Sequence, residues 1–126
     1  MTRKNITSEN APAAIGPYSQ AIWAGDLLYL SGQTPIDPTN NKLVEGDIHT
    51  QTARAFDNLE DVLRTAGLTM DHVIKCNVYL TSMSHFSGMN EVYKSRFNSP
   101  FPARTTVAVL ELPLGALVEI EMVAKK

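Results

Sequence analysis

The sequence predicts a single α+β domain of two layers spanning residues 1–126, and three observations support this fold class. The 126 residues are enough for one hydrophobic core and too few for two domains of ordinary size. Hydrophobic residues make up 44% and charged residues 19% of the chain, as in a globular protein and unlike a disordered one. Strand-like and helix-like patterns follow one another in the order β-β-α-β-α-β-β. We therefore expect two helices on one face of a mixed sheet.

A β-hairpin is predicted near the N-terminus, with strands at residues 19–24 and 27–31. The pair Gly25-Asp26 between these two runs is a turn signal. Residues 35–47 follow, and they are rich in Pro, Asn, Asp and Thr. Because these residue types favour turns, we expect a surface loop there.

The first helix is predicted over residues 53–66, where apolar side chains recur every three or four positions. Gly67 stands where a C-terminal cap belongs. Residues 73–80 then alternate as a half-buried strand does, with one face made of Ile74, Cys76, Val78 and Leu80.

A second helix is predicted over residues 84–97, with a weaker apolar stripe, and Pro100 and Pro102 follow it. Two further strands, 103–110 and 117–124, complete the order. Residues 27–30 and 107–110 are apolar at every position, which predicts strands buried on both faces. Since two helices cannot cover both faces of the sheet, we expect a homo-oligomer in which another copy covers the second face.

Charge and cysteine content narrow the function classes. The chain carries 11 Lys and Arg against 13 Asp and Glu, a net charge of -2, whereas non-specific nucleic-acid binders are usually more basic. Its one cysteine, Cys76, cannot form an internal disulfide, and no Cys or His spacing typical of a metal site is present. No apolar run approaches the ~20 residues that cross a bilayer, and the N-terminus lacks the apolar core of a signal peptide. We expect a cytoplasmic protein without a metal, with a trimmed organellar presequence left open.

Several residues are candidates for chemistry. Arg104 begins the strand at 103–110, either as a structural ion-pair partner or as a planar fork that binds a small carboxylate in a bidentate pair. Glu119 and Glu121 project from one face of the last strand, where one of them could hold a water and move protons, and spacing alone does not choose between them. Tyr18 follows the Gly16-Pro17 bend and can present its hydroxyl to a pocket or pack in an interface.

The segment 31–33 ends the predicted hairpin, and Gly32 in it would let a ligand approach the backbone closely. With these residues in view, five segments of the sequence resemble the RidA/YjgF family in order and spacing, and most closely its RidA subgroup, the reactive intermediate deaminases. These segments are 10–18 (NAPAAIGPY), 31–33 (SGQ), 90–93 (NEVY), 101–104 (FPAR) and 119–121 (EIE).

The resemblance implies a chorismate-mutase-like fold assembled as a homotrimer around a central β-barrel, with sites in the three clefts between subunits. It also implies hydrolysis of 2-iminobutanoate or 2-iminopropanoate, or of their enamine tautomers, to the 2-oxo acid and ammonia. Pyridoxal-phosphate enzymes such as threonine dehydratase release such imines. The chain itself would need no cofactor.

The same resemblance assigns roles to residues. Arg104 would bind the substrate carboxylate, and Glu119 would position the attacking water and relay protons. Tyr18 is counted with these two as a catalytic candidate. The remaining positions would line the cleft and bind substrate: Ser31, Gly32, Asn90, Phe86 and Thr106. Many relatives have a cysteine where this chain has Thr106, which argues against a mechanism that needs a thiol there.

Three other functions stay open at this point. A trimeric protein could bind small 2-oxo acids in the same cleft without turnover. Some relatives are described as endoribonucleases or translation inhibitors, and others as chaperone-like proteins. The slightly acidic charge disfavours the nuclease, because nucleic-acid affinity comes mostly from Lys and Arg contacts to phosphates.

Overall fold

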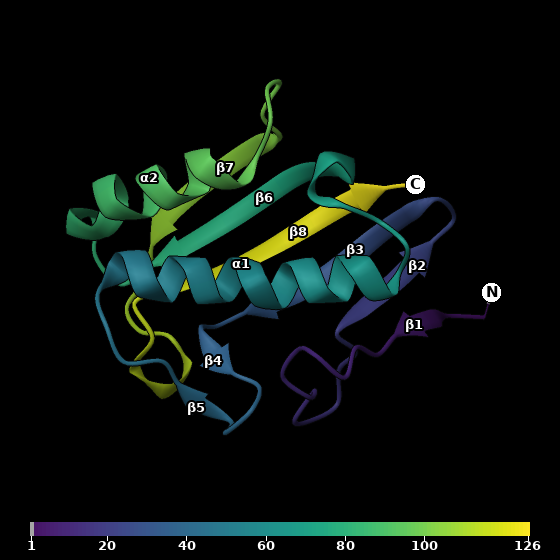
Figure 1. Ribbon diagram of the computed structural model, residues 1–126, viewed down its shortest axis with the longest axis horizontal. Helices are drawn as coiled ribbons and strands as arrows, with labels where there is room; N and C mark the ends of the chain where they lie inside the picture. Colours follow the sequence, from purple (N-terminus) through teal and green to yellow (C-terminus); the bar gives the residue numbers. More distant parts are fainter. Residues whose placement is uncertain (1) are drawn as a thin grey trace.

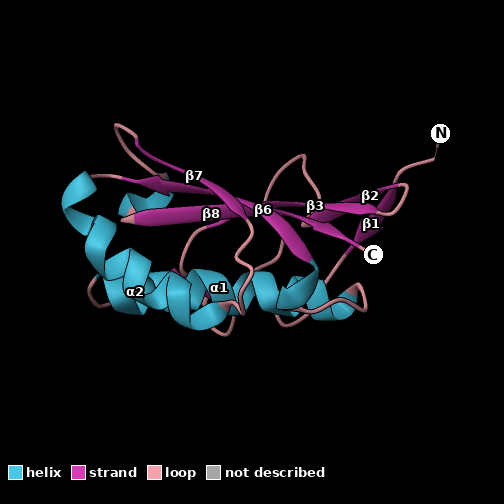
Figure 2. Cartoon of the chain, turned by 90° about the horizontal axis from the view of Figure 1, so that it is seen from above, coloured by secondary structure: helices cyan, strands magenta, loops and turns pink. Residues whose placement is uncertain are grey.

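The structure, a computed structural model, describes residues 2–126 and shows one six-stranded sheet with two helices on one of its faces (Figures 1 and 2). The helices are α1 (Ile48–Thr65) and α2 (Phe86–Arg96). The strands of the main sheet are β1 (Lys4–Ile6), β2 (Ala21–Ala24), β3 (Leu27–Gln33), β6 (Val73–Leu80), β7 (Ala103–Ala108) and β8 (Val118–Lys125). The α+β class and the two-layer arrangement are therefore confirmed.

The strands of the main sheet lie in the order β1-β2-β3-β8-β6-β7. β6 and β7 run parallel, whereas the other neighbouring strands pair antiparallel. Parallel strands need a crossover connection, and α2 supplies it between β6 and β7. The crossover brings α2 close to β7, so that Asn90 on α2 is hydrogen-bonded to Arg104 on β7.

Three short strands were not predicted. β1 pairs with β2, and the expected loop at 35–47 contains a small hairpin of β4 (Ile36–Asp37) and β5 (Lys42–Leu43). Strands of two or three residues are too short to show a two-residue period, so the sequence pattern did not reveal them. Short 3₁₀ helices also form at Met70–His72, Met83–His85 and Pro113–Gly115.

Most predicted element boundaries shift by one or two residues, and the start of α1 shifts by more. α1 begins at Ile48, five residues before its predicted start, because Asp47 caps it by accepting a hydrogen bond from the Thr50 N–H at 3.0 Å. β7 ends at Ala108, so Leu110 lies outside the strand and is 96% exposed.

The predicted apolar face of β6 is wrong for Ile74, which is 45% exposed, whereas Cys76, Val78 and Leu80 are fully buried. The reason is an irregularity between Val73 and Lys75, where the pairing of β6 with β8 shifts by one residue. A bulge places consecutive side chains out of alternation and turns Ile74 toward solvent.

The core lies between the sheet and the helices, where α1 contributes the fully buried side chains Ala55, Phe56, Leu59, Val62 and Leu63. The opposite face of the sheet has no helix over it (Figure 2). Tyr29 on β3 is 51% exposed on that face and Val107 on β7 is 42% exposed. Burial of these side chains by another copy stays a prediction.

Candidate active site

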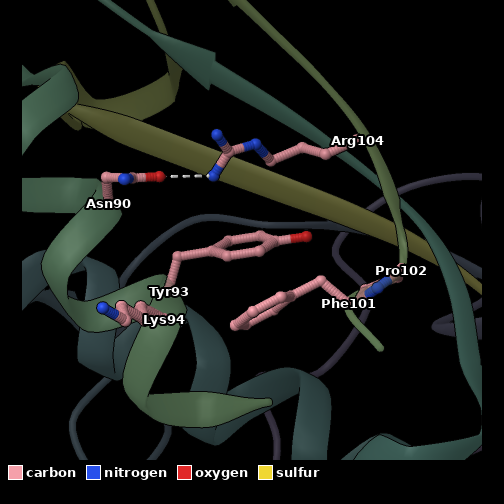
Figure 3. Close-up of a pocket in the computed structure, with 6 residues that line it drawn as sticks. All are labelled: Asn90, Tyr93, Lys94, Phe101, Pro102 and Arg104. Atoms are coloured by element: carbon pink, nitrogen blue, oxygen red, sulfur yellow. Dashed lines mark hydrogen bonds between the residues drawn. The ribbon is translucent and has the colours of Figure 1, made fainter. Parts of the chain in front are cut away.

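Arg104 lies at the start of β7 with its side chain directed toward the helices. Its register partner on β6 is Cys76, which is buried on the helix-covered face. From there its Nη1 donates a hydrogen bond of 2.7 Å to the Oδ1 of Asn90 on α2 (Figure 3). The carbon of the guanidinium group lies 4.6 Å from the ring centre of Tyr93 and 5.5 Å from that of Phe86. One hydrogen bond and two aromatic rings thus hold the guanidinium group in place.

A pocket of about 420 Å³ opens beside this arginine. Figure 3 shows the six side chains that line it: Asn90, Tyr93, Lys94, Phe101, Pro102 and Arg104. The sequence-based candidates Arg104 and Asn90 therefore meet here. Phe86, which was predicted to line the cleft, lies beside the arginine but is not among the residues that line this pocket. Within residues 2–126 Arg104 forms no ion pair with a carboxylate. Its remaining N–H groups are free to bind an anion.

Tyr93 lies beside Arg104 but was not predicted as a site residue: it was placed in the apolar stripe of the second helix and in the segment 90–93 that resembles the family, with no role assigned. It is 4% exposed, and its ring packs against Phe56 and Phe97 at centroid distances of 5.6 and 4.9 Å. Its hydroxyl is buried beside the thiol of Cys76, a weak acceptor, and makes no regular hydrogen bond within residues 2–126. Its position one turn after Asn90 was the available signal, but an aromatic at helical spacing fits a core equally well.

We expect Tyr93→Phe to fold at least as stably as the wild type, because it removes a buried hydroxyl without a regular partner. Tyr93→Leu should lower the free energy of unfolding by roughly 2 kcal/mol, since a buried ring is lost. Urea unfolding at one fixed protein concentration measures both values. A loss of stability above about 1 kcal/mol in the Phe variant would show that the hydroxyl has a stabilising partner.

Cys76 does not supply a nucleophile. It is fully buried, and burial raises the pKa of its thiol to about 11, so the thiol stays protonated near neutral pH.

Thr106 lies two residues beyond Arg104 and faces the same side of β7. Its hydroxyl is buried without a hydrogen-bond partner in the described chain, and it does not line the Arg104 pocket. No group of His, Cys, Asp and Glu in residues 2–126 is arranged to hold a metal ion.

The two glutamates of β8 lie on the face of the sheet opposite to the helices, and their surroundings differ. Glu121 accepts hydrogen bonds on Oε1 from Asn77 at 3.0 Å and from the Tyr79 hydroxyl at 2.5 Å. Glu119 has no side-chain hydrogen bond within residues 2–126, and burial, together with the nearby charge of Glu121, raises the pKa of Glu119. The choice that spacing left open therefore falls on Glu119 as the available proton acceptor.

Gly32 lies against Glu119, because a Cβ at position 32 would overlap the carboxylate of Glu119. A second pocket of about 400 Å³ contains Gly32, Glu119 and Tyr18 among its lining residues. Tyr18 is 52% exposed there. Ser31 is adjacent in sequence, but its hydroxyl donates a hydrogen bond of 2.6 Å to the Ser19 carbonyl and does not line this pocket.

The candidate residues thus form two groups, on opposite faces of one sheet. Arg104, Asn90 and Phe86 lie on the helix side, at the β7 edge. Glu119, Gly32 and Tyr18 lie by the open face, and β6 separates β8 from β7. With strands about 4.8 Å apart, the two strands are about 10 Å apart and their side chains point away from each other. A single chain does not bring Arg104 and Glu119 into one site.

No helix in residues 2–126 is both long and apolar enough to cross a membrane. The fold and the two groups of residues define a small α+β protein with an arginine fork on one side of its sheet and a partly buried glutamate on the other. Comparison with known proteins supports this class. A family model described as Endoribonuclease L-PSP matches residues 8–126.

Individual relatives match over nearly the whole chain. A RutC family protein of Pyrococcus horikoshii is 49% identical over 121 residues, 96% of each chain. A 2-iminobutanoate/2-iminopropanoate deaminase of Bos taurus is 43% identical over 98% of this chain and 90% of its own. The solved structure of the Rid family protein YyfA from Yersinia pestis superposes with a TM-score of 0.96 at 46% identity, over 99% of this chain and 100% of that one. The chain belongs to the RidA/YjgF family.

Proposed function

We propose that this chain is a deaminase that hydrolyses small 2-imino acids, such as 2-iminobutanoate and 2-iminopropanoate, to 2-oxo acids and ammonia. The observation that supports this most directly is the Arg104 fork, fixed by Asn90 and Tyr93 and left without a carboxylate partner in the described chain. A bidentate arginine is suited to a small planar carboxylate. The name of the bovine relative gives the same reaction.

The active unit in this proposal is a homotrimer. Its subunits would cover the open faces of the sheets, where Tyr29 and Val107 are exposed, and form a central barrel. Each cleft between neighbours would join the Arg104 half of one subunit to the Glu119 half of the next. This arrangement resolves the separation of the two half-sites across one sheet.

The reaction needs little catalytic machinery, because imines already hydrolyse in water. Arg104 binds the substrate carboxylate and fixes the position of the C=N carbon. The carboxylate of Glu119 takes a proton from a water as the water oxygen adds to that carbon, and it passes this proton to the nitrogen, which gives a neutral carbinolamine. Glu119 then takes the proton of the carbinolamine hydroxyl and delivers it to the nitrogen as the C–N bond breaks, so that the C=O bond forms, ammonia leaves and the carboxylate is restored. Tyr18 would donate a hydrogen bond to the reacting group from the same half-site as Glu119.

No cofactor takes part in these steps. The substrate would come from pyridoxal-phosphate enzymes that eliminate water from hydroxy amino acids, such as threonine dehydratase. This chain has Thr106 at the position where many relatives have a cysteine, so that position offers no thiol nucleophile. This is consistent with a mechanism that forms no covalent intermediate on the protein.

The proposal is tested by coupling the protein to threonine dehydratase in a buffer that contains semicarbazide, which traps the imine as a semicarbazone. A deaminase should suppress semicarbazone formation in proportion to its concentration. Absence of suppression, together with binding of 2-oxobutanoate by the intact assembly, would instead support the non-catalytic binder. RNA cleavage is tested separately, and a flat response of RNA binding to salt would remove the nuclease alternative.

The pH dependence of turnover should report Glu119. Its pKa is raised by burial, so the carboxylate becomes protonated at a higher pH than an ordinary glutamate. The step needs the ionised form, hence kcat should fall as the pH drops through this raised pKa and reach a plateau above it. A stopped assay that measures kcat from pH 4.5 to 8 records this fall at low pH. In Glu119→Gln the residual kcat should no longer fall at low pH, and an unchanged fall would assign the titration to another group.

A further inference from the structure

We propose that Glu121 is a positioning residue for Glu119. Its carboxylate accepts the hydrogen bonds of both neighbouring donors and places a fixed negative charge beside Glu119, which leaves Glu119 unbonded and a stronger base toward water. Glu121 does not line the pocket that contains Glu119, so it acts through Glu119 and not on the substrate. This inference rests on the proposed function and assigns a second residue to its proton-transfer step.

The register of β6 and β8 places four polar side chains together on the open face of the sheet. Tyr79 lies directly opposite Glu119, and Asn77 lies directly opposite Glu121. Side chains in such opposite pairs start about 5 Å apart, whereas those on the diagonal start about 7–8 Å apart. The register alone would therefore pair Tyr79 with Glu119.

The hydrogen bonds depart from this pairing, because both reach one oxygen of Glu121. The Tyr79 hydroxyl donates along the diagonal to the Oε1 of Glu121 at 2.5 Å, and the Asn77 amide donates to the same atom at 3.0 Å. The bond to Glu121 raises the pKa of Tyr79 to about 12, so this hydroxyl stays protonated and remains a donor. Glu119 is left without the donor that lies directly opposite it.

The two carboxylates are close enough for the charge of Glu121 to act on Glu119. They are two residues apart on one strand, so their side chains start about 7 Å apart on the same face. The charge of Glu121 adds to burial in raising the pKa of Glu119. A carboxylate with a raised pKa takes a proton from water more readily than an ordinary glutamate does.

The other titratable groups on this face in residues 2–126 place no positive charge beside Glu119. Its pocket contains one other titratable side chain, Tyr18, which offers a hydroxyl. On β3, Tyr29 pairs with Val123, four residues beyond Glu119. On β6, Lys75 also pairs with Val123, and its ammonium group donates to a threonine hydroxyl of β7 at 3.0 Å.

The proposed assembly adds one cation to these groups, because Arg104 of a neighbouring subunit would face Glu119. The test therefore uses kcat, which reports the complex with bound substrate, where Arg104 is paired with the substrate carboxylate. The same arginine is present in every variant compared, so a difference between the variants reports Glu121.

The test records kcat from pH 4.5 to 8 in the wild type and two variants. Glu121→Gln keeps an oxygen that can accept both hydrogen bonds but loses the charge. Its kcat should fall at a lower pH than that of the wild type, and its plateau should be about threefold lower, because Glu119 becomes a weaker base. Glu121→Asp keeps the charge, and the pH of its fall should stay near the wild-type value.

Glu60→Gln is the matched control, since it removes a negative charge from α1 on the other side of the sheet (Figure 2). It should keep the wild-type pH profile. Light scattering checks that all variants have the same mass. A second measurement needs no variant with a changed cluster: in the wild type, ¹³C NMR of the two carboxyl carbons should show Glu119 taking its proton before Glu121 as the pH falls.

The outcomes separate this inference from the proposed function. A lower kcat in Glu121→Gln with an unchanged pH of the fall would show a merely structural role and overturn the inference. An equal shift in Glu121→Asp, or protonation of Glu121 before Glu119, would overturn it too. Each of these results leaves the deaminase intact, because the wild type still suppresses semicarbazone. If the wild type shows no suppression, both proposals fail together.

Discussion

Arg104→Ala is expected to lower kcat/KM for 2-iminobutanoate by about 100-fold or more. The guanidinium group would make two charge-assisted hydrogen bonds to the substrate carboxylate, each worth about 1.5–3 kcal/mol. Alanine removes both, and it also leaves the Asn90 amide and the Tyr93 ring without their partner. The semicarbazide-coupled assay with purified variant and wild type measures the loss.

Arg104→Lys refines this result. Lysine keeps the positive charge but loses the planar fork and its stacking on Tyr93, so an intermediate loss with a raised KM is expected. Arg96→Lys is a matched control, because Arg96 also lies over an aromatic ring, that of Phe56, but lines neither half-site. Full activity of Arg104→Ala in an assembly of unchanged size would remove the carboxylate-binding role.

Mixing two inactive variants should restore activity if each site is shared between neighbours. Arg104→Ala retains an intact Glu119 half, and Glu119→Gln retains an intact Arg104 half. When the two are unfolded together and refolded at equal amounts, about a quarter of the interfaces in a random assembly pair two intact halves. Activity should therefore recover to about a quarter of the wild-type value from nearly none.

The control for this experiment is the Arg104→Ala, Glu119→Gln double variant refolded with the wild type. At equal amounts it also leaves about a quarter of the interfaces intact, because both good halves come from wild-type subunits. Light scattering confirms that all samples have the same mass. No recovery in the mixture of single variants, with about half of the wild-type activity in the control, would place both halves in one chain and contradict the shared site.

Much of the fold could be predicted from hydrophobic periodicity, and the exceptions have physical reasons. β6 was predicted with its observed bounds because eight residues show the alternation clearly. Ile74 was assigned to the wrong face, because a bulge breaks the alternation without leaving a mark in residue type. β4 and β5, of two residues each, depend on a hairpin pairing that no local pattern encodes.

The site was predictable only in part. Arg104, Gly32 and the pair Glu119 and Glu121 were proposed from their positions in strands and turns. The preference for Glu119 came from the family resemblance, and its physical basis is a tertiary feature. Asn77 and Tyr79 on β6 donate hydrogen bonds to the carboxylate of Glu121 on the neighbouring strand. Such pairing between strands that are far apart in sequence is not visible in local spacing. Lys94 lines the Arg104 pocket because α2 packs beside β7, which the sequence order alone does not specify.

The placement of the two half-sites on opposite faces of one sheet also bears on when a newly made molecule becomes active. Under the proposed assembly, a freshly folded chain holds a complete set of functional residues and yet has no working site until it meets other copies. At low abundance, the rate of imine removal would then rise more steeply than in proportion to the number of chains made. Imine removal would therefore begin only above a threshold concentration of chains. Serial dilution of the purified protein would show specific activity falling as the subunits separate.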